Sequence, residues 1–315
     1  NDNSHQPAIS FANNTNVAKL VGSLGAIFGG SAEWMFSSTF SNCTSLTEIP
    51  ENLFSGQRSG ADRMFYGTFR GCTSLIEVPA NLFSGITDSA EYMFYYTFDG
   101  CTSLTKIAGN PFPNLTGNAP GMFNQTFSNC TLLNNIPKDL FAGVSGSATD
   151  MFNYTFANCT SLTNIPKELF SGISGGAEGM FSYTFHNCTS LFDIPATLFS
   201  GINTSAYQMF NQTFRNCASL TEIPGTLFQN IKGESAQEVF SGTFANCTSL
   251  TSIPNGLFKN ITGKPAEYAF SGTFYECTNL TGTVPVDLFE NLDTADYVSG
   301  PMEFIFNGTN LDTQC

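Results

Sequence analysis

The chain is poor in charge, and especially in basic residues. Of its 315 residues only 11% are Asp, Glu, Lys or Arg, and 25 acidic against 11 basic residues give a formal net charge of −14. Proteins that bind nucleic acids or anionic membranes carry clusters of Lys and Arg. The composition therefore argues against nucleic acid and against an anionic membrane surface as partners.

Long apolar runs are also missing. No stretch approaches the roughly 18 consecutive apolar residues of a membrane-spanning helix, so we expect no membrane span. The opening decapeptide, NDNSHQPAIS, is polar and is no signal peptide, and it is compatible with the mature end of a secreted chain. With 41% hydrophobic residues, the chain still has enough apolar side chains for a large core.

What the chain does have is one motif in many copies. Cys recurs at intervals of 29 residues six times and then of 30 residues twice, and a Leu follows each of these cysteines three residues later. The cysteines are Cys43, Cys72, Cys101, Cys130, Cys159, Cys188, Cys217, Cys247 and Cys277. Such a period is typical of a solenoid, in which each unit buries its apolar face against its neighbours.

The pattern within each unit predicts a helix and a strand. In SAEYMFYYTFDGCTSLTKI, which begins at Ser89, the apolar residues have helical spacing. Asn or Gly precedes nearly every Cys, which predicts a left-handed helix end. The SLTEIP-like segment that follows predicts a short strand ending at Pro. A second left-handed position is expected two residues after each LF pair, as at Gly85 and Gly201.

The sequence thus predicts an α/β leucine-ladder solenoid of about nine 29–30-residue repeats, each a short parallel strand, a turn and a helix, with degenerate end caps. Three columns hold 28 of the 32 Phe residues and should form the core, with Phe11, Phe192, Phe304 and Phe306 outside them. The expected segments are an N-terminal tail at 1–16, an N-terminal capping repeat at 17–42, the solenoid at 43–290 and a C-terminal capping segment at 291–315.

The units resemble the leucine-rich repeats of BspA-like bacterial surface proteins. Those repeats read aromatic residue, two residues, Cys, two residues, Leu, as FSNCTSL does from Phe40 to Leu46. The resemblance covers roughly residues 17 to 311, and this chain differs in its MFxxTF segment and its LTxIP strand. It implies a leucine-rich-repeat fold, a secreted or cell-surface location and a role in binding or adhesion.

The repeated cysteine is the main candidate for chemistry. A metal site needs converging ligands and a nucleophile needs an adjacent base, but these cysteines are far apart in sequence and His5 and His186 are isolated. Disulfides between rungs are the stronger alternative in a secreted chain, yet equivalent side chains in a ladder point the same way. We expect reduced, buried thiols that pack as small apolar groups, and a terminal Cys315 that is free or cross-linked. The sequence predicts no catalytic, metal-binding or cofactor-binding residue and no enzyme.

Two surfaces are candidates for contact with a partner. On the concave face of the strands, Ser and Thr flank the ladder Leu, and four residues break that pattern: Ile76, Leu132, Asn134 and Phe192. This face is either a plain solvated sheet, a ligand face with many weak contacts, or an ice-binding lattice. On the convex face of the helices, outward aromatic residues either form an interface or lie over neighbouring helices. These residues are Trp34, Tyr66, Tyr92, Tyr95, Tyr96, Tyr154 and Tyr183.

Two functions follow from these surfaces. The leading hypothesis is a secreted or cell-surface binding and adhesion module that contacts protein or glycan on a host or neighbouring cell. The alternative is a structural protein that self-associates into extracellular filaments or arrays through its aromatic residues or its open ends. Repeated Asn-Cys-Thr triplets, such as that of Asn42, would carry glycans only in a eukaryotic secretory product.

Overall fold

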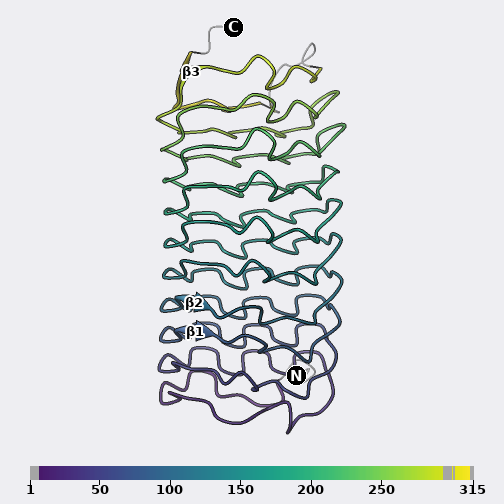
Figure 1. Cartoon of the computed structure of the whole chain (residues 1–315), viewed down its shortest axis with the longest axis vertical. Coiled ribbons are helices and arrows are strands. Elements are labelled where there is room, and N and C mark those ends of the chain that lie inside the picture. Colours follow the sequence, from purple (N-terminus) through teal and green to yellow (C-terminus); the bar gives the residue numbers. More distant parts are fainter. Residues whose placement is uncertain (1–6, 294–299, 301, 313–315) are drawn as a thin grey trace.

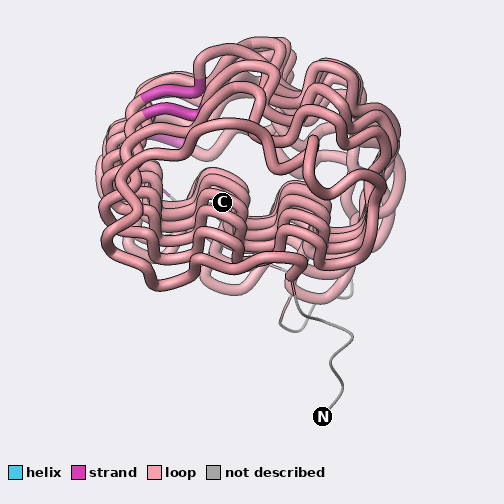
Figure 2. The backbone as a smooth tube through the Cα atoms, turned by 90° about the horizontal axis from the view of Figure 1, so that it is seen from below, coloured by secondary structure: helices cyan, strands magenta, loops and turns pink. Residues whose placement is uncertain are grey.

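The computed structural model describes residues 7–293, 300 and 302–312, and it shows one continuous stack of rungs. Each rung is one circuit of the chain around a common long axis, and the labelled strands lie along one side of the stack (Figure 1). Viewed along that axis, the rungs superimpose as a rounded outline (Figure 2), and buried side chains fill its interior. The solenoid expected from the repeat is therefore confirmed.

The predicted helices are wrong, because the described residues contain no helix. The regular elements of this part of the chain are β1 (Glu77–Val78), β2 (Lys106–Ile107), β3 (Thr281–Thr283) and β4 (Asn310–Asp312). β1 pairs in parallel with β2, β3 pairs in parallel with β4, and isolated parallel bridges join other rungs. The repeat is a short extended segment followed by turns, and not a strand, a turn and a helix.

The segments predicted as helices are series of tight turns. In one rung φ is 51° at Tyr92, 59° at Tyr96 and 72° at Gly100, so every fourth residue is left-handed. The same three positions are left-handed in each of the nine rungs, from Trp34, Ser38 and Asn42 to Tyr268, Gly272 and Glu276. A turn that repeats every four residues buries two neighbours and exposes the next two. Over a dozen residues this spacing cannot be told from the 3.6-residue period of a helix.

Hydrogen bonds between rungs explain why turns replace a helix here. The N–H groups of Phe94, Tyr96 and Phe98 donate to carbonyl oxygens of the next rung at 2.8–3.2 Å. The residues between them donate three positions back within their own rung, so that every N–H from Phe94 to Cys101 has a partner. A left-handed residue other than glycine costs about 1–2 kcal/mol. The bonds between rungs, which an α-helix would not make, offset that cost.

The left-handed residue predicted before each Cys is confirmed, whereas the second predicted position is wrong at every described equivalent of Gly56, including Gly85 and Gly201. Neither has a positive φ, unlike Gly56 in the first rung, where φ is 102°. Their role is to leave space. A Cβ at Gly85 would lie 1.8 Å from the backbone oxygen of Gln57 in the preceding rung. Glycine is needed there because two rungs approach closely.

Columns of stacked Phe rings fill the inside of the coil. In the column of the TF pairs, successive ring centroids lie 5.4–5.9 Å apart and the interplanar angles are 13° or less. Phe11 and Phe306, which the sequence pattern left outside the core, extend this column at its two ends. Phe192 and Phe304 do lie outside it, with 52% and 58% of their surfaces exposed.

Residues 8–13 cover the open edge of the first rung. Three of their N–H groups donate to its carbonyl oxygens at 2.7–2.9 Å: Ala8 to Met35, Phe11 to Thr39 and Asn13 to Ser41. The carbonyl of Phe11 also accepts a hydrogen bond from the thiol of Cys43, just as a Phe carbonyl accepts one from the ladder thiol of each later rung. This segment reproduces the contacts of a preceding rung, which is how a solenoid protects its terminal core. The division of the chain into tail, caps and solenoid stays a prediction.

Candidate binding faces

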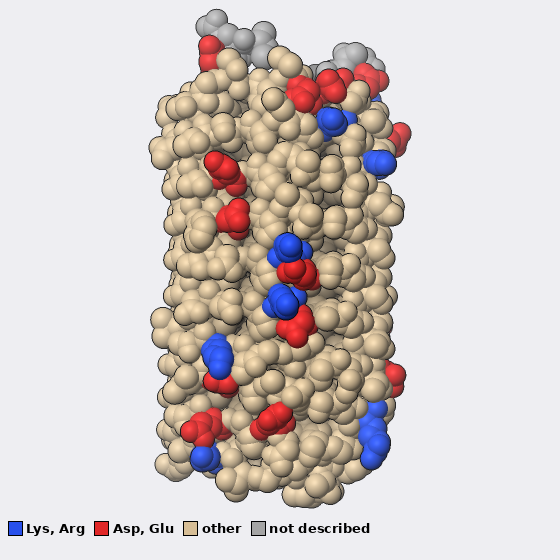
Figure 3. All heavy atoms as spheres, in the orientation of Figure 1, with Lys and Arg blue, Asp and Glu red and all other residues tan. Residues whose placement is uncertain are grey.

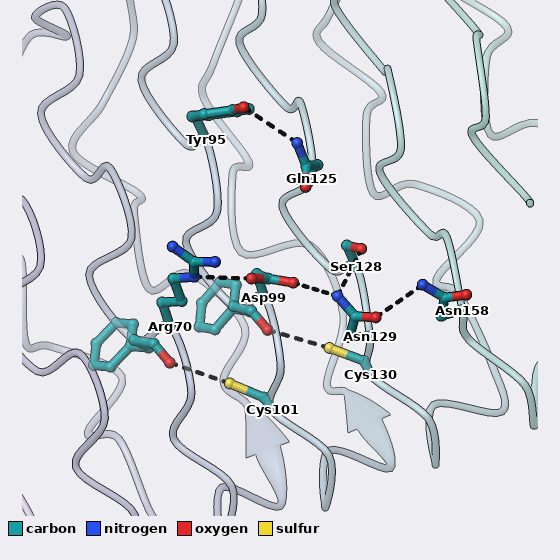
Figure 4. Close-up of polar contacts among 11 residues, drawn as sticks. Arg70, Tyr95, Asp99, Cys101, Gln125, Ser128, Asn129, Cys130 and Asn158 are labelled. Atoms are coloured by element: carbon teal, nitrogen blue, oxygen red, sulfur yellow. Dashed lines mark hydrogen bonds and ion pairs between the residues drawn. The ribbon is translucent and has the colours of Figure 1, made fainter.

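The nine ladder cysteines are buried and free, as predicted. Each thiol donates to the carbonyl oxygen of a Phe in the preceding rung over 3.0–3.3 Å, and Figure 4 shows this for Cys101 and Cys130. Burial raises the pKa of Cys72 to about 12, so this thiol is protonated near neutral pH. A protonated and inward thiol is a packing group and not a nucleophile. Cys315 lies outside the described residues.

A ladder of polar side chains runs beside the thiols (Figure 4). Asp99 accepts from Arg70 Nε at 2.9 Å and from Asn129 Nδ2 at 2.7 Å, and Asn129 Oδ1 accepts from Asn158 Nδ2 at 2.8 Å. Asn158 in turn accepts from Asn187. The amides of these Asn-Cys-Thr triplets are thus used inside the fold, and a glycan on Asn158 would be attached to the nitrogen that donates to Asn129. The ladder is structural.

The four residues predicted for the strand side all face solvent. Ile76 is 53% exposed, Leu132 49% and Phe192 52%, and Asn134 is also exposed. Ile76, Asn134 and Phe192 occupy one column at intervals of 58 residues, or two rungs, and Leu132 lies two residues to the side. The N–H of Ile76 donates to the carbonyl of Thr47, which fixes the register of this column. We call the surface of Ile76, Leu132, Asn134 and Phe192 the strand face; it presents a line of side chains and no single deep pocket.

The strand face has a shallow hollow and a column of sparse charges beside it. The hollow, of about 410 Å³, lies next to Ile76. Two ion pairs connect neighbouring rungs in the charged column: Glu48 with Lys19 at 2.6 Å, and Glu77 with Lys106 at 3.4 Å. Further along, Asp193 and Glu222 are exposed, and no ion pair among the described residues uses them. Figure 3 shows a mostly uncharged surface on which the charged residues stand singly or in small groups of opposite sign.

The aromatic residues predicted for the convex side lie on turns and are half-buried, because rings of neighbouring rungs cover one another. The Tyr66 ring centroid lies 5.4 Å from that of Trp34, 5.2 Å from Tyr95 and 5.8 Å from Tyr96. Tyr92 joins the group through Tyr95 at 5.7 Å. We call these five residues the aromatic cluster. Burial raises the pKa of Tyr95, and Tyr96 adds to the effect.

Two arginines that sequence reasoning missed hold the aromatic cluster. The guanidinium carbon of Arg63 lies 5.4 Å from the Trp34 ring centroid and 4.9 Å from that of Tyr92. Arg70 lies 4.3 Å from the Tyr96 ring centroid. Each such contact is worth about 0.5–1 kcal/mol at an exposed site. The sequence contained a signal for this arrangement, because Arg63 is 29 residues from both Trp34 and Tyr92.

The other two predicted aromatic residues form a separate pair. The rings of Tyr154 and Tyr183 stack with centroids 4.3 Å apart and an interplanar angle of 5°. His186 lies beside Tyr183 with ring centroids 5.4 Å apart. Burial lowers the pKa of His186, and the charge of Arg215 lowers it further, so the imidazole is neutral at pH 7. The structure therefore divides the predicted aromatic surface into two parts.

Within the described ranges, no three His, Cys, Asp or Glu side chains converge as metal ligands would. The same residues include no helix with the length and apolarity of a membrane span.

The family comparison matches most of the chain. The model described as "BspA type Leucine rich repeat region", in six copies, matches residues 27–233 and 147–295. The search of curated proteins gives no match. Similar solved structures include a T. pallidum leucine-rich repeat protein (17% identity, 62% of this chain and 85% of that chain, TM-score 0.30) and a Bacteroides ovatus one (17%, 97% and 86%, 0.23). A leucine rich cell surface protein from Faecalibacterium prausnitzii matches at 17% identity over 88% and 76% of the two chains, with a TM-score of 0.29.

Identities and TM-scores this low carry no further argument, so the assignment rests on the repeat motif and its match to the family model. The match extends over residues 27–295 of 315. The chain belongs to the BspA-type leucine-rich repeat proteins.

Proposed function

We propose that the chain is a secreted or cell-surface binding module whose strand face contacts a partner. The observation that carries this proposal is the exposure of Ile76, Leu132 and Phe192, each close to half exposed, in columns that otherwise hold Ser, Thr and Asn. The ladder residues beside them, Leu75, Leu133 and Leu191, are fully buried, so these exposed apolar side chains add to a core that the ladder already fills. An extracellular location is in keeping with the chain's membership of the BspA-type leucine-rich repeat proteins.

A line of separate contacts suits a large partner better than a small molecule. Small ligands bind in concave sites that bury most of their surface. The strand face offers only the shallow hollow beside Ile76, while its exposed residues span five rungs, from the rung of Ile76 to that of Phe192. The arrangement fits many modest contacts that act together. It gives no support to an enzymatic function, which needs converging catalytic groups.

Self-assembly is the second candidate, and one observation weighs against its end-to-end form. Residues 8–13 already occupy the carbonyl oxygens of the first rung, so another molecule would have to displace them. Lateral assembly through the aromatic cluster remains as an alternative, since Trp, Tyr and Arg are enriched in interfaces. Its rings, however, pack against one another, so part of their surface is not available to a second molecule.

Replacing the three exposed apolar residues tests the proposed function. The variant Ile76→Thr, Leu132→Ser, Phe192→Thr (the strand-face variant) introduces residues that other rungs carry at these positions. It should therefore keep its fold and its denaturation midpoint. We expect its binding to an array of immobilised secreted proteins and glycans to fall at least tenfold below that of the unmodified chain, since exposed apolar anchors supply much of the contact energy.

The control is Trp34→Ala, Tyr95→Ala, Tyr96→Ala, which truncates the aromatic cluster and leaves the strand face intact. This variant should bind the array normally. Loss of binding in this control, with normal binding by the strand-face variant, would contradict the proposal. Sedimentation of all three proteins tests the alternative function: polymers that the control cannot form would favour a structural role.

A further inference from the structure

The spacing of the apolar residues on the strand face defines the shape of its partner. Ile76 and Phe192 stand in one column, four rungs apart, and Leu132 lies beside that column at the midpoint. Hydrogen bonds between the rungs hold the column in parallel register. Neighbouring parallel segments lie about 4.8 Å apart, so the apolar contacts recur every ~9.6 Å and extend over ~19 Å.

We infer that the strand face binds an amphipathic α-helix with a basic flank, laid along the long axis of the stack. This inference rests on the proposed function, since it takes the strand face as the contact surface. Seven residues of α-helix advance ~10.5 Å and return to nearly the same side, and fourteen advance ~21 Å. The helical repeat thus matches the axial spacing from Ile76 to Phe192 to within about 2 Å over its whole length. Leu132 lies two residues, roughly 6.6 Å, to the side of that line, so it would contact the flank of the helix.

Other extended partners fit this spacing less well. A β-strand presents one face every ~6.6 Å, so a side chain ~9.6 Å away points to its opposite face. A polyproline helix repeats every ~9.3 Å and matches in length. Such helices, however, dock in grooves lined by aromatic rings, and among the four strand-face residues only Phe192 is aromatic.

The charges beside the strand face favour a basic partner. Asp193 directly follows Phe192, and Glu222 lies one rung further on. Both are exposed and stand outside the ion pairs of the described residues, whereas Glu77 is paired with Lys106. Lys or Arg next to the apolar stripe of the helix would lie close to these carboxylates at the Phe192 end. Charge pairs at the rim of an interface select the partner and its direction.

A titration with three labelled peptides of about 18 residues, ~27 Å long as helices, tests the inference. The first peptide has Leu at every seventh position and Lys beside each Leu, with Ala elsewhere. The second has the same composition in shuffled order. The third is proline-rich, with Leu at every third position and the same number of Lys. We expect the full chain to bind the first peptide at least tenfold more tightly than the other two, measured by fluorescence anisotropy.

Two variants locate the site. The strand-face variant should lose the preference for the first peptide, and the control that truncates the aromatic cluster should keep it. The double substitution Asp193→Asn, Glu222→Gln should lower the affinity for the first peptide several-fold at low salt and less at high salt. Equal affinity for the three peptides, tighter binding of the proline-rich peptide, or an unchanged preference in the strand-face variant would overturn the inference. Such a result would leave the proposed function standing if the strand-face variant still shows reduced binding to the array of proteins and glycans.

Discussion

Replacing Phe156 by Ala is expected to lower the free energy of unfolding by about 3–5 kcal/mol, the usual cost of truncating a buried aromatic residue. Phe156 is fully buried and stacks between Phe127 and Phe185, with ring centroids 5.7 and 5.6 Å away. The rigid stack on both sides cannot collapse into the space that the ring leaves. Chemical denaturation monitored by circular dichroism of the backbone measures the change in the free energy of unfolding.

The matched control for this substitution is Tyr154→Ala, two residues earlier on the outer side of the same rung. Tyr154 is half-buried, and among the described residues its ring stacks only with that of Tyr183. Its truncation should cost about 1 kcal/mol or less, the value of one partly exposed aromatic contact. A loss below about 1 kcal/mol for Phe156→Ala would show that the stacked column is not the core.

Alkaline pH is expected to unfold the protein through its thiols. Burial raises the pKa of Cys72 and Cys277 to about 12 from an ordinary value of 9.0. Both states are protonated below pH 9, so stability is fully present there, and between pH 9 and 12 only the unfolded chain ionises. The folded state therefore loses stability as pH rises through this window. At about 1.4 kcal/mol for each pH unit, the loss reaches about 4 kcal/mol for each of these two thiols at pH 12.

The other ladder cysteines act in the same direction. Burial raises the pKa of Cys101, Cys130 and Cys159 well above 9.0. The denaturation midpoint measured from pH 8 to 12 should therefore fall steeply. In Cys159→Ser the hydroxyl can donate to the carbonyl of Phe127 as the thiol does. Because a hydroxyl does not ionise in this range, the unfolding of this variant should release one proton fewer, and its free energy of unfolding should fall less steeply with pH. A midpoint that is constant above pH 9 would contradict the burial of the thiols.

The repeat and its core were predictable because both depend only on period. A spacing of 29 or 30 residues brings equivalent residues together whatever the local structure, so the inward positions of Cys, Leu and most Phe followed directly. The same rule explains contacts that were missed: Arg70 and Asp99 form an ion pair and are 29 residues apart. Phe11 was missed because the first rung lacks the surrounding motif.

The local structure of the rung was not predictable from the spacing of apolar residues. A helix and a four-residue turn repeat place nearly the same residues inward over a dozen positions. Propensity also favoured the wrong choice, because Tyr92, Tyr96 and Tyr154 are left-handed here and Tyr rarely is. Hydrogen bonds to neighbouring rungs decide between the two structures, and no local pattern records them.

The candidate faces were predictable in part. Alternation around the ladder Leu placed Ile76, Leu132, Asn134 and Phe192 at the surface, where the structure has them, although their role in binding stays a prediction. The aromatic side chains were expected on a helix surface, where they would either form an interface or lie over neighbouring helices. They lie on turns and cover one another, because left-handed turns stack the same position of successive rungs.

Comparing Gly and Ala at position 125 tests the turn structure of the rung most directly. Gln125 has a φ of 54° and its side chain donates to the Tyr95 hydroxyl, a bond that both substitutions remove equally. In a left-handed turn Ala retains the cost of about 1–2 kcal/mol that Gly avoids, so Gln125→Gly should be more stable than Gln125→Ala by about 1 kcal/mol. In a helix the order reverses, because Gly is about 1 kcal/mol worse than Ala. A Gly variant that is the less stable of the two would contradict the structure described for every rung.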